Sequence, residues 1–155
     1  MSMKVFFLKR LGFVALMIAL IPGLQAADWP LFRGDRGLTG AAAGKLPEKL
    51  SLLWKFDAKG PVKASAVIAN GMVYVGGDDD GNKGLKGKLY AIDLATGKQA
   101  WDFTCNDPIE ASAMVLDGRV YTGSVDGFVY ALDAKTGKEL WKFETGDQIT
   151  GAPNW

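Results

Sequence analysis

The sequence predicts an all-β protein built from repeated four-stranded antiparallel units. A twelve-residue phrase occurs twice, as YAIDLATGKQAW at residues 90–101 and as YALDAKTGKELW at residues 130–141, and seven of its twelve positions are identical. Beyond residue 27 the apolar residues do not follow the 3.6-residue period of a helix, and they form short runs between turn dipeptides. Both observations indicate that the chain repeats a small β unit.

A longer stretch before each phrase is repeated as well. Residues 62–77 (VKASAVIANGMVYVGG) match residues 109–124 (IEASAMVLDGRVYTGS) in Ala-Ser-Ala, in a turn glycine and in Val-Tyr-x-Gly. These stretches are 47 residues apart whereas the phrases are 40 apart, so the first unit is expected to carry a seven-residue insertion between its second and third strands. A third copy begins at residues 143–153.

Each unit is expected to contain four strands. The first strands are predicted at 63–69 and 110–116, and they end at Asn70-Gly71 and Asp117-Gly118, dipeptides that favour two-residue hairpins. The second strands are predicted at 72–76 and 119–123, the third at 88–93 and 128–133, and the fourth around Trp101 and Trp141. Four short antiparallel strands in about 40 residues are typical of a propeller blade. The predicted fold class is an incomplete all-β propeller, with about two four-stranded blades and the start of a third.

The repeated phrase has a structural interpretation. Asp93 and Asp133 end the third strands and are expected to accept hydrogen bonds from the backbone of the following turn. Thr-Gly at 96–97 and 136–137 supplies a hydroxyl group and a residue that adopts positive φ. The tryptophan that follows is expected to pack on a neighbouring blade and to donate its indole N–H to a backbone carbonyl. The phrase therefore predicts turns and blade packing, and no catalytic residue is assigned to it.

The N-terminus has the pattern of a secretory signal peptide. Lys4, Lys9 and Arg10 precede an apolar stretch at 11–21, and Leu24-Gln25-Ala26 fits a cleavage site. Eleven apolar residues are well short of the roughly 20 that a membrane-spanning helix needs, which disfavours an uncleaved anchor. We expect residues 1–26 to be removed and the mature chain to be periplasmic or extracellular.

Charge and composition exclude several classes of function. Removing residues 1–26 changes the formal charge from +1 to −2, and no basic run remains, so nucleic acid and anionic membranes are not expected as partners. The sequence contains no histidine, which excludes Ser-His-Asp, Cys-His and His-metal chemistry within these residues. The single cysteine, Cys105, cannot form an internal disulfide and is expected to be a small buried side chain.

Three short motifs have functional readings that the sequence disfavours. Asp78, Asp80 and Asn82 alternate like the first ligands of a calcium loop, but the sixth and twelfth positions of that loop would be Lys83 and Leu89. A flexible hairpin extension is therefore expected, and no metal site is predicted. The tripeptide Arg-Gly-Asp at 33–35 is not interpreted as an adhesion motif, and KGPVK at 59–63 is expected to carry solvated loop charges.

At the repeated phrases the sequence resembles the PQQ-like, or quinoprotein-type, β-propeller repeat proteins. Their docking motif, Ala-x-Asp-x-x-Thr-Gly-x-x-x-Trp, is matched by two sets of residues: Ala91, Asp93, Thr96, Gly97 and Trp101, and Ala131, Asp133, Thr136, Gly137 and Trp141. The N-terminal DWPLFRGDRGLTG and the later LLWKF also resemble secreted members. The resemblance implies the fold but no single activity, since the family includes quinoprotein dehydrogenases, the barrel-assembly lipoprotein of the outer membrane and secreted scaffolds.

The resemblance and the repeats together give an expected organisation. The signal peptide (1–26) is followed by an N-terminal segment (27–50) and by propeller repeats (51–155), with units at about 58–104 and 105–144 and a third from about 145. Trp54 lies on what resembles a fourth strand without the three strands that should precede it. Because propellers close with roughly four to eight blades, the chain is expected to be the N-terminal part of a longer protein.

Two main functions remain open at this stage, beside a sensor or a carbohydrate-active propeller attached to another domain. One is an exported, non-catalytic interaction scaffold of the cell envelope, with envelope proteins or polymers as partners. The alternative is the N-terminal part of a PQQ-dependent alcohol or sugar dehydrogenase, which would use PQQ and calcium as cofactors. The resembling dehydrogenases carry adjacent cysteines against the cofactor, and the single Cys105 does not supply them.

Overall fold

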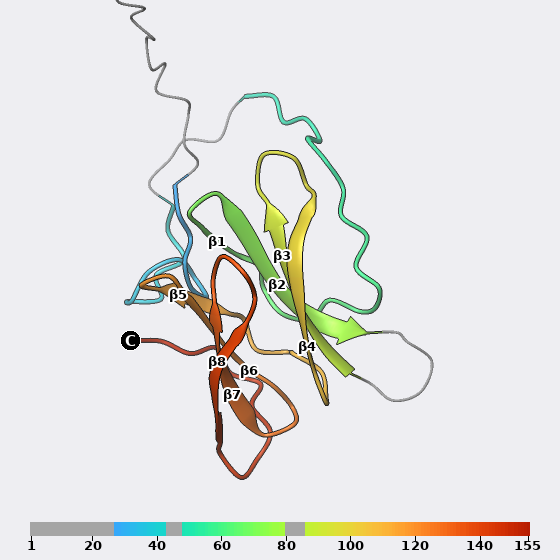
Figure 1. The fold of residues 1–155 in the computed structure, drawn as a ribbon. Helices are drawn as coiled ribbons and strands as arrows, with labels where there is room; N and C mark the ends of the chain where they lie inside the picture. The colour runs from blue at the N-terminus through green and yellow to red at the C-terminus, as the bar shows by residue number, and fades with distance from the viewer. Residues whose placement is uncertain (1–26, 43–47, 80–85) are drawn as a thin grey trace, which may run out of the picture.

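A computed structural model describes residues 27–42, 48–79 and 86–155, and Figure 1 shows their arrangement. The expected signal peptide, Asp80 and Asn82 lie outside the described residues. The described residues form two four-stranded antiparallel sheets and contain no helix. A membrane-spanning helix is therefore absent from these residues. The prediction of an all-β fold with four-stranded blades is confirmed.

Each sheet is a meander in which every strand pairs with the next strand of the chain. The first blade contains β1 (Val67–Ala69), β2 (Met72–Asp79), β3 (Lys86–Asp93) and β4 (Gln99–Cys105), in that order across the sheet. The second blade contains β5 (Met114–Leu116), β6 (Arg119–Gly123), β7 (Phe128–Asp133) and β8 (Glu139–Glu144), again in order. The inner strands β1 and β5 contact each other across the two sheets.

The hairpins between the first two strands of each blade have the geometry that their sequence predicts. Asn70 and Gly71 have φ angles of 52° and 76°, and Asp117 and Gly118 have φ angles of 47° and 72°. Positive φ at both central residues is the conformation of a type I′ turn, whose twist matches that of the strands it joins. Asn and Asp tolerate this conformation better than other residues with a side chain.

The strand boundaries differ from the prediction at two places. The inner strands begin at Val67 and Met114, whereas 63–69 and 110–116 were expected. The backbone before β1 is bonded elsewhere, because Ser65 donates its N–H to Ser112 Oγ at 3.0 Å in the second blade. In the first blade β2 and β3 are longer than predicted, because their pairing continues to Asp79 and Lys86.

The main apolar core lies between the two blades. It contains side chains of β4 that face β6 and β7, and the rings of Phe103 and Tyr130 meet there with centroids 5.0 Å apart. The opposite face of the first blade is covered by residues 54–58: Trp54, Phe56 and Ala58 pack on Val73, Tyr90 and Ile92. Residues 54–58 thus pack on the first blade in the same way that residues 101–105 pack on the second.

The start of the third repeat also follows the pattern of the second. A Cβ atom added at Gly76 would lie 2.4 Å from Ile109, and one added at Gly123 would lie 2.2 Å from Ile149. Ile109 and Ile149 donate their N–H groups to the carbonyls of Gly77 and Ser124, at 3.4 and 3.1 Å. The first residues of the next repeat therefore pack directly against a glycine of each blade. A side chain at that glycine would clash with them.

The N-terminal segment runs along the inner strands. Trp29 pairs with Ile68 through two backbone hydrogen bonds, and Pro30 accepts a hydrogen bond from Val115 N at 2.7 Å. Farther along, the Arg36 guanidinium donates to the carbonyl of Trp155 at 3.0 Å. In Figure 1 the blue segment and the C-terminus lie on the same side of the molecule as β1 and β5. The segment thereby covers one end of the inner strands of both blades.

Candidate functional site

The aspartates of the repeated phrase hold the turns after β3 and β7. Asp93 Oδ1 accepts hydrogen bonds from the N–H and hydroxyl of Thr96, at 2.8 and 2.6 Å. Asp133 Oδ1 accepts the same two bonds from Thr136, both at 2.8 Å. The hydroxyl bond from threonine is the largest influence that lowers the pKa of each carboxyl group. Both aspartates are therefore bound within the turns that follow β3 and β7.

Two tryptophans make equivalent contacts with the turns of the following blade. Trp54 Nε1 donates to the carbonyl of Leu94 at 2.8 Å, and Trp101 Nε1 donates to the carbonyl of Ala134 at 3.1 Å. Each ring lies against the turn glycine, Gly97 or Gly137, which has a positive φ of 69° or 72°. Trp101 is 9% exposed.

The two alanines of the repeated phrase lie opposite the tryptophans, on the neighbouring strand of the same sheet. Ala91 is opposite Trp101 in the register of β3 and β4, and Ala131 is opposite Trp141 in β7 and β8. Both alanines are fully buried. A larger side chain at either position would meet close-packed neighbours.

Trp141 has a different environment from Trp101. It is 45% exposed, and Phe143 on the same strand is 64% exposed. Its ring contacts Tyr121 with centroids 6.0 Å apart, as the ring of Trp101 contacts Tyr74 at 5.8 Å. The aromatic pair within the blade is thus preserved, and the face of β8 is open among the described residues.

Asp78 is the one calcium-loop candidate that the structure describes. Its side chain is buried, Oδ2 lies 4.0 Å from Lys63 Nζ, and Oδ1 has no hydrogen-bond partner within the described part of the chain. Lys63 in turn forms a 2.6 Å ion pair with Glu110 Oε1. The bond to Glu110, followed by the charge of Asp78, raises the pKa of Lys63, which stays protonated.

Lys63 is an exposed loop charge, as predicted for KGPVK, but its ion pair with Glu110 was not predicted. Its ammonium group joins the first blade to the second, although half of its side chain is exposed. The repeats contained a signal for this contact, since Lys63 and Glu110 occupy the same position of two units that lie 47 residues apart. Sequence reasoning missed it because the pair forms across two blades.

A pocket of about 250 Å³ lies beside the ion pair. Its lining comes from the N-terminal segment, from the residues just before β1 and β5, and from the start of the third repeat: Phe32, Lys63, Ser65, Glu110, Ser112, Thr150, Gly151 and Ala152. Corresponding positions of three successive repeats therefore surround one hollow. It combines an aromatic ring, hydroxyl groups and a compensated pair of charges.

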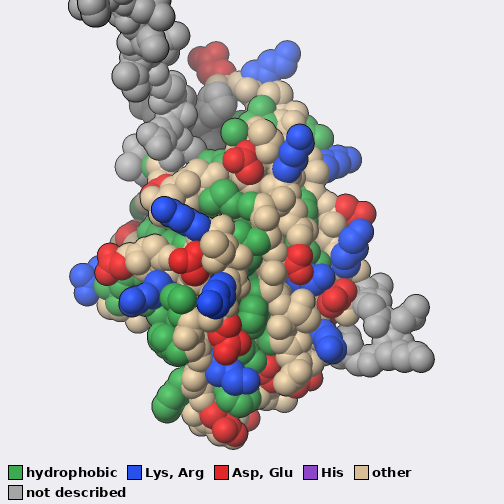
Figure 2. Space-filling model, viewed as in Figure 1, with side chains coloured by type: hydrophobic (Ala, Val, Ile, Leu, Met, Phe, Trp, Pro, Cys, Tyr) green, Lys and Arg blue, Asp and Glu red, His purple; other side chains and the backbone are tan. Residues whose placement is uncertain are grey.

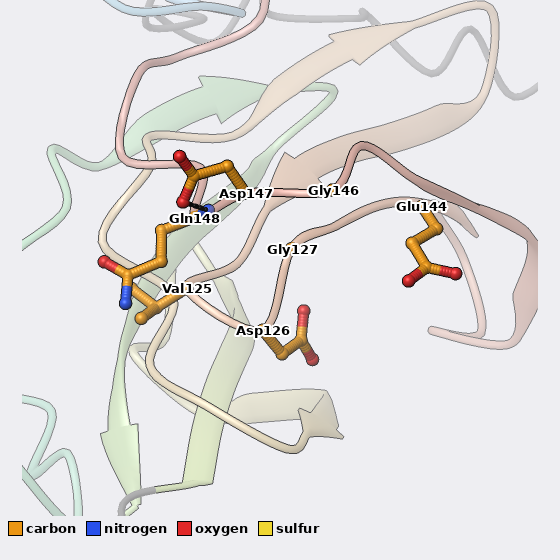
Figure 3. A pocket seen from close by; sticks show the side chains of 7 residues that line it. All are labelled: Val125, Asp126, Gly127, Glu144, Gly146, Asp147 and Gln148. Carbon is orange, nitrogen blue, oxygen red and sulfur yellow. Dashed lines mark hydrogen bonds between the residues drawn. The ribbon is translucent and has the colours of Figure 1, made fainter.

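A second hollow, of about 210 Å³, lies at the far end of the second blade and is shown in Figure 3. Three carboxylates line it, from Asp126, Glu144 and Asp147. In Figure 3 these side chains extend in different directions and do not converge. Asp126 already accepts hydrogen bonds from Asn106 N, Phe128 N and the hydroxyl of Tyr130. This carboxylate is held by its structural partners.

The described residues do not fit a calcium–quinone centre. Within residues 27–42, 48–79 and 86–155, no three His, Cys, Asp or Glu side chains are grouped as metal ligands would be. Cys105 is buried, and its burial raises the thiol pKa to about 11. We therefore derive no step through PQQ or calcium from these residues.

The surface of the blades carries mixed charges. In Figure 2 lysine and arginine side chains alternate with aspartate and glutamate over the visible face, and hydrophobic side chains lie between them. Lys88 illustrates the arrangement, since it lies between Asp79 and Asp102 at 3.5 and 3.2 Å. This face offers no one-signed surface to a polyanion.

Comparison with solved structures gives similarity over most of the chain. The quinohemoprotein alcohol dehydrogenase ADHIIG from Pseudomonas putida HK5 is 25% identical with a TM-score of 0.65, over 83% of this chain and 21% of that one. The quinohemoprotein alcohol dehydrogenase from Comamonas testosteroni is 29% identical with a TM-score of 0.60, over 83% and 22%. BamB from Moraxella catarrhalis is 21% identical with a TM-score of 0.52, over 61% and 28%. The chain thus spans about a quarter of the length of these proteins.

Sequence comparison places the chain in a family. No curated protein matches it. A family model described as "Outer membrane protein assembly factor BamB" matches residues 47–153, which is more than half of the chain. This protein belongs to that family of PQQ-like β-propeller repeats.

Proposed function

We propose that the protein is an exported, non-catalytic interaction scaffold of the cell envelope. Its blade edges and the loops at the start of its inner strands would contact envelope proteins or polymers. The proposal includes removal of residues 1–26 as a signal peptide, because their pattern is that of a secreted chain.

The proposal is supported by the structural partners of several acidic side chains. Asp93 and Asp133 each bind a turn threonine. Asp126 accepts three hydrogen bonds, and Asp102 pairs with Lys88. Glu110 is bound to Lys63. A general base must be free to take a proton from substrate at a cavity, whereas these carboxylates have structural partners. The description of the matching family as an assembly factor supports the same reading.

Binding of a partner in cells tests the scaffold. A photo-reactive amino acid at Leu140, an exposed position on the edge strand β8, should give one discrete adduct with an envelope protein identified by mass spectrometry. The matched control is the same amino acid at Lys135, an exposed turn position. A diffuse pattern, or the same adducts from both positions, would count against a specific scaffold.

A second candidate is part of a PQQ-dependent dehydrogenase. The observation that favours it is the higher TM-scores of the two alcohol dehydrogenases, 0.65 and 0.60, against 0.52 for BamB. Under this alternative, residues outside the described blades would supply the calcium ligands and the base. The two functions predict opposite results when the protein is supplied with PQQ, calcium and an alcohol.

A further inference from the structure

The pocket between the starts of β1 and β5 has the size of a site for one small ring. Its volume is about 250 Å³, just below the roughly 300–1,000 Å³ of typical small-molecule sites. Apart from Phe32, its walls come from corresponding positions of three repeats: Lys63 and Ser65, Glu110 and Ser112, and Thr150, Gly151 and Ala152. The pocket is thus formed by the repeat architecture and by one residue of the N-terminal segment, Phe32.

Phe32 gives the pocket an apolar surface that is held in place. The ring is 39% exposed and lines the pocket. The preceding residue, Leu31, is buried, and Pro30 is bonded to Val115 of β5 at 2.7 Å. Because its neighbours are fixed to the inner strands, the ring can receive the apolar face of a ligand without ordering a loose segment.

The polar groups of the pocket favour a neutral ligand. Lys63 Nζ and Glu110 Oε1 are 2.6 Å apart, and the same ammonium group lies 4.0 Å from Asp78 Oδ2, so both charges that line the pocket already have partners. An anion or a cation would have to break this pair before it could be bound, and that costs binding free energy. A hydroxyl group both donates and accepts, so it can contact Lys63 and Glu110 together without separating them.

The remaining wall contains three hydroxyl side chains beside Gly151 and Ala152. Ser65 and Thr150 line the pocket and are exposed. Ser112 is buried, and its Oγ accepts the N–H of Ser65 at 3.0 Å. The pocket therefore offers an aromatic ring together with several groups that donate and accept hydrogen bonds.

We propose that this pocket binds the ring of a neutral sugar. The C–H face of the ring would lie on Phe32, and its hydroxyl groups would bond to Ser65, Thr150 and the Lys63–Glu110 pair. The proposal rests on the proposed function, since it names a ligand class for a non-catalytic envelope protein.

Three sugar probes test the ligand class. They share one kind of ring and are neutral, anionic and cationic. Binding of methyl β-glucoside, glucuronate and glucosamine to the whole protein is measured by NMR titration, with backbone signals of 63–65 and 110–112 as the readout. Methyl β-glucoside should give saturable shifts there and bind several-fold more tightly than the two charged probes. Absence of saturable shifts with the neutral probe, or tighter binding of a charged probe, overturns the proposal.

A matched pair of variants tests the aromatic surface. Phe32→Leu should weaken methyl β-glucoside binding by roughly fivefold to tenfold, since an aromatic contact is lost. Phe143→Leu makes the same change at a 64% exposed ring outside the pocket and should leave binding unchanged. Equal effects of the two variants would contradict a site at Phe32.

Two further variants test the charge pair that lines the pocket. Glu110→Gln leaves Lys63 without its 2.6 Å partner and should raise affinity for glucuronate several-fold. Lys63→Gln leaves Glu110 without this partner and should raise affinity for glucosamine several-fold. Unchanged charge selectivity in both variants overturns the proposal.

These outcomes are separate from failure of the scaffold function. Failed sugar binding together with a discrete adduct at Leu140 overturns only the pocket. PQQ-dependent alcohol oxidation would overturn the scaffold and leave the titration to decide the pocket.

Discussion

Trp101 on β4 donates its indole N–H to the carbonyl oxygen of Ala134 at 3.1 Å. Ala134 follows β7, so this bond joins the outer strand of the first blade to a turn of the second. Trp54 makes the equivalent bond with Leu94 at 2.8 Å, although residues 50–58 form no strand. The contact is therefore a repeated element of blade packing.

Loss of the Trp101 ring should destabilise the protein strongly. The ring is 9% exposed, so Trp101→Ala should reduce the free energy of unfolding by about 3–5 kcal/mol. In the 155-residue chain, Trp141→Ala removes the same side chain from a 45% exposed position and should cost about 1 kcal/mol there. Urea unfolding measures both, and equal losses would contradict the difference in packing.

The glycine beneath the ring should tolerate no side chain. At Gly137, with φ of 72°, an added Cβ would lie 2.5 Å from the Trp101 ring. Gly118 has the same φ of 72° and open space around it. Gly118→Ala should therefore cost about 1 kcal/mol through backbone strain, and Gly137→Ala should cost roughly 1–3 kcal/mol more through displacement of the ring. Similar melting temperatures for the two variants would show that the ring is not held against the glycine.

The turn aspartates should make stability depend on acid pH. The pKa values of Asp93 and Asp133 are lowered from the usual 3.8 in the folded state, chiefly by the threonine hydroxyl bonds. Their contribution to stability is therefore present above the unfolded pKa and is lost as pH falls through the folded one. The difference in melting temperature between the parent and Thr96→Val should be largest at neutral pH and shrink below pH 3.8. A difference that stays constant into this acid range would argue against the charged acceptor.

Cys105 should be unreactive while the protein is folded. Burial is the main cause that raises its pKa to about 11, and the thiol donates to the carbonyl of Asp107 at 3.2 Å. Because the thiolate is the reacting species, iodoacetamide should label the folded protein far more slowly at neutral pH than the urea-unfolded protein. Equal rates would show that the thiol is accessible in the folded state.

The sequence predicts those features whose causes are local. The dipeptides Asn70-Gly71 and Asp117-Gly118 determine two hairpins, because few residues adopt positive φ twice in succession. Asp93 and Thr96 determine their turn because donor and acceptor are three residues apart.

Features that depend on contact between repeats could not be predicted from local patterns. The inner strand β1 is shorter than expected because Ser65 bonds to Ser112 of the other blade. The pairing of Trp29 with Ile68 joins residues that are far apart in sequence, and no periodicity connects them. The Lys63–Glu110 pair and the pocket beside it depend on the same packing.

The most direct test of the non-catalytic scaffold is alcohol-dependent reduction of an artificial electron acceptor. The protein purified from its own cells is supplied with PQQ and calcium, and dye reduction is followed with and without a primary alcohol. The scaffold predicts a rate equal to that of a blank without protein. A rate that requires alcohol, PQQ and calcium together would contradict the scaffold and establish the dehydrogenase.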